Sequence, residues 1–151
     1  MGPLPERGGS GLMSSQGEDM LIHLGRPEMA PAFAISIRQP WAELILRGWK
    51  LTEYRSWRIP EKYWGEWLYL HVPAAMSKWE RSLTRKRVGT FAPILGGYVG
   101  CVRFGCPTRE FTPIDAYEYI DWPCCWHWPV TGAERIPFIP AKGNLRIFKV
   151  R

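Results

Sequence analysis

The alternation of apolar and polar positions predicts five short strands. In residues 50–57 (KLTEYRSW), every second residue from Leu51 falls on one face of the strand and the residues between them fall on the other. The last part of the chain, from His127, is rich in Pro and Gly, so we expect turns there that end in a final strand. The five predicted strands are 33–37 (FAISI), 50–57, 65–72 (GEWLYLHV), 96–106 (GGYVGCVRFGC) and 145–150 (LRIFKV).

Helical periodicity predicts two or three short helices. The first begins near Pro40 and ends near Gly48, because Pro favours a first helical turn and Gly favours the end of a helix. In the second, Ser77 and Glu80 have the spacing of a capping box at the start of KWERSLTRKRV. A third short helix would begin with Thr112 as its cap. Because strands are short and outnumber helices, we predict an α+β fold, a small mixed β-barrel with two or three peripheral helices.

The first 32 residues differ in composition from the rest of the chain. They are rich in Gly, Ser and Pro and are predicted to form a flexible N-terminal tail, followed by one domain over residues 33–151. The chain has no run of eighteen apolar residues and no secretory signal pattern, so we expect no membrane contact and a cytoplasmic protein. Its four cysteines do not have zinc-site spacing, so we expect reduced thiols, no metal and no cofactor.

The positive charge is concentrated in the predicted domain. Residues 1–32 carry two basic and four acidic side chains, and the whole chain has 20 basic and 14 acidic ones, which leaves 18 and 10 for the domain. A basic domain attracts polyanions, of which nucleic acid is the commonest inside a cell. The alternative is that the charge serves solubility alone.

Residues 36–57 (SIRQPWAELILRGWKLTEYRSW) hold much of the candidate chemistry. Gly48, Lys50, Glu53 and Arg55 in GWKLTEYR match the pattern Gly-x-Lys-x-x-Glu-x-Arg. Together with SIRQPWA, GEWLYLHVPA and IPFIPAKGNLRIFKV, this pattern resembles ASCH domains of the PUA-like superfamily over residues 33–151. The chain is identified as a small stand-alone member of that family.

The resemblance implies a barrel with a cleft beside the Gly-x-Lys-x-x-Glu-x-Arg segment and a role on RNA or nucleotides. Arg38, Lys50 and Arg55 would then contact phosphate, and Glu53 would orient them. From the residues alone, the favoured interpretation of Glu53 and Arg55 is a cross-strand ion pair that binds no ligand, because most charge pairs are solvated surface features. The predicted nucleic-acid-binding residues are Arg38, Gln39, Lys50, Glu53, Arg55, Trp57, His71, Lys78, Arg81 and Arg85.

Two other functions stay open. Some ASCH proteins resemble hydrolases, either ribonucleases or amidohydrolases that act on modified nucleosides. In that case Lys50 would be the catalytic base and Glu53 its partner or a metal ligand. The deacylases carry Thr three places after the Lys, where this chain has Glu53. The third possibility is a protein-interaction domain whose basic surface is incidental. We expect a monomer whose partner is RNA or a nucleotide, with DNA as a possible partner.

Several aromatic and basic residues have both a functional and a structural interpretation. Trp57, Trp67 and Tyr69 would provide a stacking surface for a base or would pack in the core. His71 would be a proton shuttle or a hydrogen-bonded structural residue. Trp41 has the spacing of a core residue.

The second predicted helix and the turn near the C-terminus add further candidates. Lys78, Arg81 and Arg85 share a helix face that would follow a phosphate backbone or simply be solvated. Lys142 and Asn144 flank Gly143 in a turn that would close the cleft.

Overall fold

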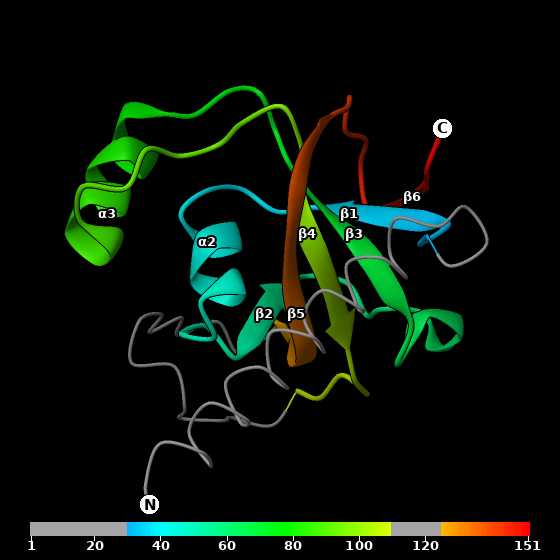
Figure 1. Cartoon of the computed structure of the whole chain (residues 1–151). Coiled ribbons are helices and arrows are strands. Elements are labelled where there is room, and N and C mark those ends of the chain that lie inside the picture. Colours follow the sequence, from blue (N-terminus) through cyan, green and yellow to red (C-terminus); the bar gives the residue numbers. More distant parts are fainter. Residues whose placement is uncertain (1–29, 110–124) are drawn as a thin grey trace, which may run out of the picture. The chain divides into compact units, whose positions relative to one another are not determined.

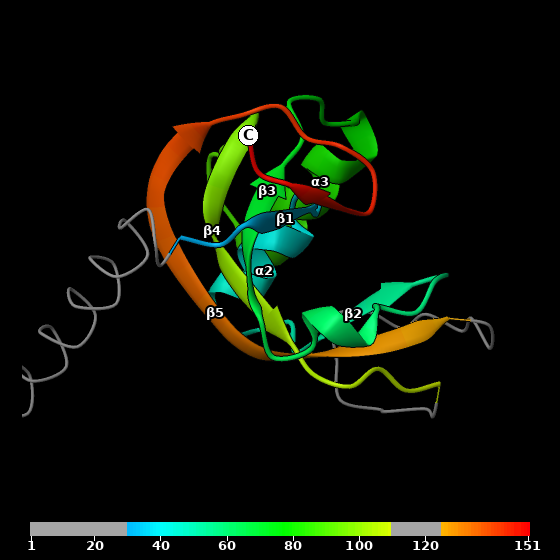
Figure 2. The same cartoon turned by 90° about the vertical axis from the view of Figure 1, so that its right-hand side faces the viewer.

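The computed structural model describes residues 30–109 and 125–151. The unit from Phe33 to Arg151 contains one mixed six-stranded sheet that curls into a half-barrel, with two α-helices among its described residues (Figures 1 and 2). The strands are β1 (Phe33–Ser36), β2 (Thr52–Arg55), β3 (Trp67–Val72), β4 (Gly97–Phe104), β5 (Trp126–Pro140) and β6 (Ile147–Lys149). The helices are α2 (Trp41–Leu46) and α3 (Lys78–Val88), and a short 3-10 turn, η1, spans Glu61–Tyr63.

The strand order is β2-β5-β4-β3-β1-β6. Only β1 and β3 run parallel among the paired strands of the described residues, and the other pairs are antiparallel. β5 is long and strongly curved, so its first part pairs with β2 and its later part pairs with β4 (Figure 2). β2 therefore lies at one end of the curled sheet, and β1 and β6 lie at the other end.

The prediction of turns from His127 onward is wrong up to Pro140, because this stretch forms most of the fifteen-residue strand β5. Pro137 is tolerated within this strand because the pairing with β4 is irregular around it. Arg135 lies opposite Gly100 and Ile139 opposite Tyr98, so β5 has extra residues between these two pairs, and Pro137 is one of them. A bulged residue needs no ladder hydrogen bond, which removes the main objection to proline in a strand.

The end of α2 and the start of α3 both depend on local sequence signals. The helix α2 is followed by Gly48, whose φ of +74° suits a glycine after a helix end. At the start of α3, the Ser77 side chain accepts from the Glu80 backbone N–H, and the Glu80 side chain accepts from the Ser77 N–H. The predicted capping box is therefore confirmed.

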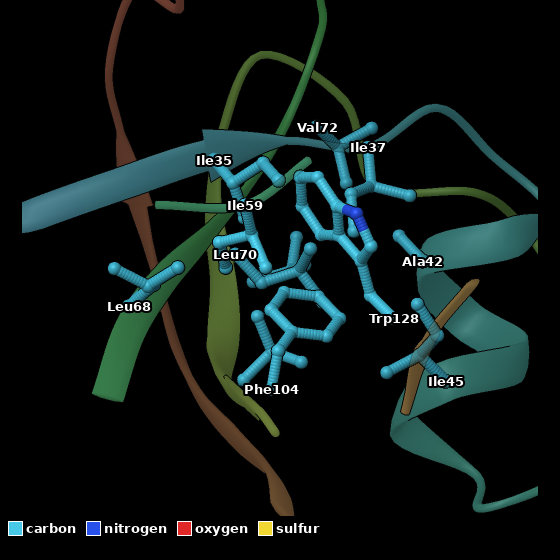
Figure 3. Packing of buried hydrophobic residues seen from close by; sticks show 12 residues of the cluster. Ile35, Ile37, Ala42, Ile45, Ile59, Leu68, Leu70, Val72, Phe104 and Trp128 are labelled. Carbon is cyan, nitrogen blue, oxygen red and sulfur yellow. The ribbon is translucent and has the colours of Figure 1, made fainter. Parts of the chain in front are cut away.

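The core lies between the inner face of the sheet and α2. Trp128 of β5 is fully buried at its centre, with the Phe104 ring centroid 5.4 Å away. Figure 3 shows the Trp128 indole surrounded by apolar side chains of β1, β3, β4 and α2. Its Nε1 donates a hydrogen bond to the Trp57 carbonyl oxygen at 3.3 Å, so the core also holds the segment after β2.

Other sequence predictions have mixed outcomes. The strand predicted over 145–150 is present as the shorter β6. The helix predicted from Thr112 and the tail up to Met29 lie outside the described residues. In the part of the chain that the structure describes, no helix has the length and apolar character needed to cross a bilayer. Of the cysteines described, Cys101 and Cys125 are buried and Cys106 is exposed.

We predict that Trp128→Ala lowers the free energy of unfolding by about 3–5 kcal/mol, because it removes a large buried ring and leaves a cavity. Urea denaturation followed by circular dichroism measures this change. Leu145→Ala is the control: Leu145 is 86% exposed, so its truncation should change stability by less than about 0.5 kcal/mol. Equal destabilisation of the two variants would contradict this description of the core.

Candidate functional site

A pocket of about 480 Å³ lies on the side where the curled sheet does not close. This volume is in the range of sites that bind small molecules. Residues at the end of β1, in β2 and in the loop before β6 come together here, although they are far apart in the sequence. We call it the arginine pocket, and its lining residues are Ser36, Ile37, Arg38, Trp41, Glu53, Tyr54, Arg55, Pro73, Asn144, Leu145 and Arg146.

Arg55 bridges the two ends of the half-barrel. Its Nη2 donates to the Ser36 carbonyl oxygen at 2.9 Å and to Glu53 Oε2 at 3.0 Å. Ser36 ends β1, whereas Arg55 ends β2, and three strands separate β2 from β1 in the sheet order. The guanidinium therefore spans the opening of the sheet and forms part of the pocket wall.

Glu53 is a buried carboxylate that the neighbouring cations compensate. It is 6% exposed, and its Oε1 lies 3.6 Å from Lys50 Nζ and accepts from the Tyr54 N–H at 3.3 Å. A buried carboxylate is costly unless it is paired, so its partners must stay close to it. Lys50 is itself only 1% exposed, and its Nζ lies 4.9 Å from the centre of the Tyr54 ring. The side chain of Lys50 therefore lies behind Glu53 and is not among the residues that line the pocket.

Arg38 lines the other side of the pocket and is held by α3. Its guanidinium donates to both carboxylate oxygens of Glu80, from Nη2 at 2.7 Å and from Nε, and Nη2 also donates to the Ala75 carbonyl at 3.2 Å. The hydrogen bond from Arg38 lowers the pKa of Glu80 to about 2, and hydrogen bonds from Ser77 add to this effect. Glu80, the third helical residue of the capping box, thus also positions Arg38.

Arg146 is a third arginine of the pocket and was not predicted from the sequence. Its guanidinium carbon lies 4.9 Å from the centre of the Trp57 ring, so it connects the loop before β6 with the segment after β2. Its φ is +56°, which is uncommon for a residue other than Gly, Asn or Asp. Such a conformation persists only where the surroundings maintain it. No sequence motif marks this position.

His71 fixes the loop of residues 141–146, which we call the closing loop. Its Nε2 donates to the Ala141 carbonyl at 2.8 Å, and its Nδ1 lies 2.9 Å from Ser36 Oγ. A Cβ at Gly143 would lie 2.5 Å from the His71 ring and 2.7 Å from Ser36 Oγ, so only glycine permits this approach. Both ring nitrogens have protein partners, an arrangement that favours the structural interpretation of His71.

The remaining predicted residues lie outside the arginine pocket. Gln39 is buried, and its Oε1 accepts from the Glu43 N–H of α2 at 3.0 Å. Trp57 packs edge-on against Trp128. The side chains on the basic face of α3 are exposed, namely Lys78, Arg81 and Arg85.

The aromatic walls of the pocket come from residues other than the predicted stacking set. Trp67 lies beneath the Arg103 guanidinium, and Tyr69 stacks on Tyr98 with ring centroids 4.6 Å apart. Trp41 and Tyr54 line the pocket instead. Trp41 was predicted as a core residue, and its half-buried ring does pack against the core while its other surface faces the pocket. Helical spacing could not distinguish these two surfaces.

A scan against protein-family models found no match to this chain, and a search of curated proteins found none either. The ASCH resemblance therefore stays a prediction that depends on the residues quoted for it.

We predict that acid weakens the link between Arg38 and α3. Glu80 has a pKa of about 2 in the folded protein against its usual 4.5, so its contribution is complete above about pH 4.5 and disappears as the pH falls toward 2. Glu80→Gln should lower the free energy of unfolding by about 1–2 kcal/mol at pH 7 and flatten this acid dependence. Urea denaturation between pH 2 and pH 7 measures both effects.

The control for this prediction is Glu61→Gln, which neutralises an exposed carboxylate in η1. It should leave the acid dependence of stability unchanged. If Glu80→Gln keeps the full decrease of stability between pH 4.5 and pH 2, Glu80 is not the group that carries it.

Proposed function

We propose that this protein binds RNA or nucleotides in the arginine pocket, as a small ASCH-type domain with a PUA-like fold. The observation that carries the proposal is the convergence of Arg38, Arg55 and Arg146 on one hollow of about 480 Å³. Planar guanidinium groups match the oxygens of a phosphate. The Nη2 groups of Arg38 and Arg55 already donate to protein acceptors, so these two side chains would bind an anion through their remaining N–H groups. Among the described lining residues, Glu53 is the one carboxylate that accompanies these three cations.

The positions of Arg38 and Arg55 support the proposal. Glu80 orients Arg38 and Glu53 orients Arg55, so neither guanidinium has to lose much freedom when an anion binds. The same carboxylates offset part of the positive charge of these two arginines. Arg146 forms no ion pair with another residue of the described ranges, so we assign it the largest share of phosphate binding.

The apolar walls of the pocket suit an unstacked base. Trp41 and Tyr54 line it beside the arginines, and single-stranded RNA is commonly held by bases that stack on such rings. The Trp41 ring is supported by Trp79, whose centroid lies 5.9 Å away. Trp79 is 64% exposed, which is unusual for tryptophan and gives it no evident role in the core. We infer that the pair forms a stacking surface at the edge of the pocket.

The hydrolase alternative rests on the resemblance alone. A general base must come within hydrogen-bonding distance of the proton that it removes. Lys50 is buried behind Glu53 and does not line the pocket, so a substrate bound there would meet Glu53 first. The geometry of the described residues therefore favours binding over catalysis by Lys50.

We predict that Arg146→Asn weakens RNA binding without unfolding the protein. Asn tolerates a positive φ, so the exchange removes the charge and keeps the backbone of the closing loop. Fluorescence anisotropy of a labelled single-stranded RNA, measured at several salt concentrations, should show about tenfold weaker binding. The negative slope of log affinity against log salt should become shallower by about 0.7, the value for one phosphate contact on a single strand.

Arg58→Asn is the matched control for Arg146→Asn. Arg58 is exposed and also lies over an aromatic ring, that of Trp64 at 4.8 Å, but it does not line the pocket. The Arg58→Asn exchange should leave the affinity for RNA and its dependence on salt nearly unchanged. A wild-type affinity that does not vary with salt, or an equal effect of the two exchanges, would overturn the proposed function.

We predict that the wild-type protein leaves RNA intact. We also predict that Lys50→Met lowers the free energy of unfolding and removes no RNA-cleaving activity. Met replaces the buried stem of Lys50 but removes the charge beside Glu53, which should cost about 2–4 kcal/mol of unfolding free energy. Gel analysis of RNA incubated with the protein, with and without divalent metal, tests the first part. Cleavage that disappears in folded Lys50→Met would replace the binding proposal with the hydrolase alternative.

A further inference from the structure

A second pocket of about 460 Å³ adjoins the arginine pocket, and no role is yet assigned to it. Its lining comes mainly from the end of β5, the closing loop and β6. Figure 1 shows these segments following one another toward the C-terminus. Its lining includes three cations and no carboxylate side chain among the described residues. The residues that matter for its chemistry are Tyr98, Lys142, Asn144, Phe148, Lys149 and Arg151.

The two pockets share a wall. Asn144 lines both of them, and the closing loop runs between them. His71 holds this loop from beneath through Ala141, which lines the second pocket, and also contacts Ser36, which lines the arginine pocket. The relative position of the two pockets is therefore fixed by buried contacts, although the loop itself is exposed.

Carboxylates compensate two of the three arginines of the first pocket but, within the described ranges, none of the cations of the second. Arg38 and Arg55 each form an ion pair with a carboxylate. Lys142, Lys149 and Arg151 form no ion pair within the described ranges, and Lys142 and Lys149 are exposed to solvent. Uncompensated cations in a concave site attract a polyanion more strongly than isolated ones on a convex surface.

Tyr98 adds a neutral donor to this pocket. It is 6% exposed and stacks on Tyr69, so its ring is fixed. Burial raises the pKa of Tyr98, so the phenol stays protonated at neutral pH. Cationic side chains together with hydroxyl and amide groups are typical of contacts to phosphate and sugar oxygens.

We propose that the ligand is a single strand of RNA that spans both pockets, with a base in the arginine pocket and a neighbouring phosphate in the second pocket. The inference rests on the proposed function and names its substrate class, an oligonucleotide rather than a mononucleotide. A mononucleotide fills the first pocket and leaves the cations of the second without an anion. A strand crosses Asn144, the wall that the pockets share, and places a phosphate beside Lys142 and Lys149.

The experiment compares a nucleoside monophosphate with RNA oligomers of increasing length, each titrated against the wild-type protein and Lys149→Glu. Calorimetry measures the monophosphate, and anisotropy measures labelled oligomers. For the wild type, affinity should rise at least about tenfold once the oligomer reaches the second pocket. Lys149→Glu should remove most of that gain and leave monophosphate binding unchanged. For the longer oligomers, the negative slope of log affinity against log salt should become shallower by about 0.7 for each phosphate that the variant no longer neutralises.

Lys62→Glu is the charge-matched control, because Lys62 is exposed in η1 and lines neither pocket. Lys142→Glu tests the same site from the closing loop, so a folding defect in one variant does not decide the result. An affinity that is independent of length, or equal effects of Lys149→Glu and Lys62→Glu, overturns the second site. If the second site is overturned but monophosphate binding still depends on Arg146, the result supports the proposed function. If no ligand of any length binds, both proposals fail.

Discussion

In the described residues, no backbone ladder joins β2 to β6, so side chains must hold the two ends of the half-barrel in place. Arg55 connects β2 to the end of β1 through the Ser36 carbonyl, and Arg146 connects the closing loop to Trp57. Each bridge places a guanidinium in the opening of the sheet. The contacts that hold the ends of the fold therefore also supply the positive charge of the arginine pocket.

Buried carboxylates determine where these cations lie. Glu53 and Glu80 are 6% and 4% exposed, and a charge in such a position needs a partner. Glu53 holds Lys50 on one side and Arg55 on the other, while Glu80 joins the cap of α3 to Arg38. An isolated surface arginine would sample many conformations. Here the geometry of two arginines is set by the packing before any anion arrives, and this favours binding of a rigid group such as phosphate.

Much of this arrangement could be predicted from local sequence signals, and the failures have identifiable causes. The capping box at Ser77 and Glu80 and the apolar strands were predictable, because they depend on neighbours in the sequence. The strand character of β5 was missed because of its prolines, and Pro137 is tolerated there through a bulge opposite β4, a tertiary feature. Arg146 was missed because the closing loop brings it to β1 and β2, and the pocket-facing surface of Trp41 was missed because helical spacing does not distinguish the two surfaces of its ring. The burial of Lys50 was likewise invisible, because spacing does not reveal which side chain lies behind another.

We propose that the hollow bounded by the end of β1, by β2 and by the closing loop receives a nucleotide. The decisive measurement is a nuclear magnetic resonance titration of the backbone amides with a nucleoside monophosphate. We expect shift changes concentrated at residues 36–38, 53–55 and 144–146. Shift changes confined to the exposed face of α3, or no change at saturating ligand, would contradict this proposal.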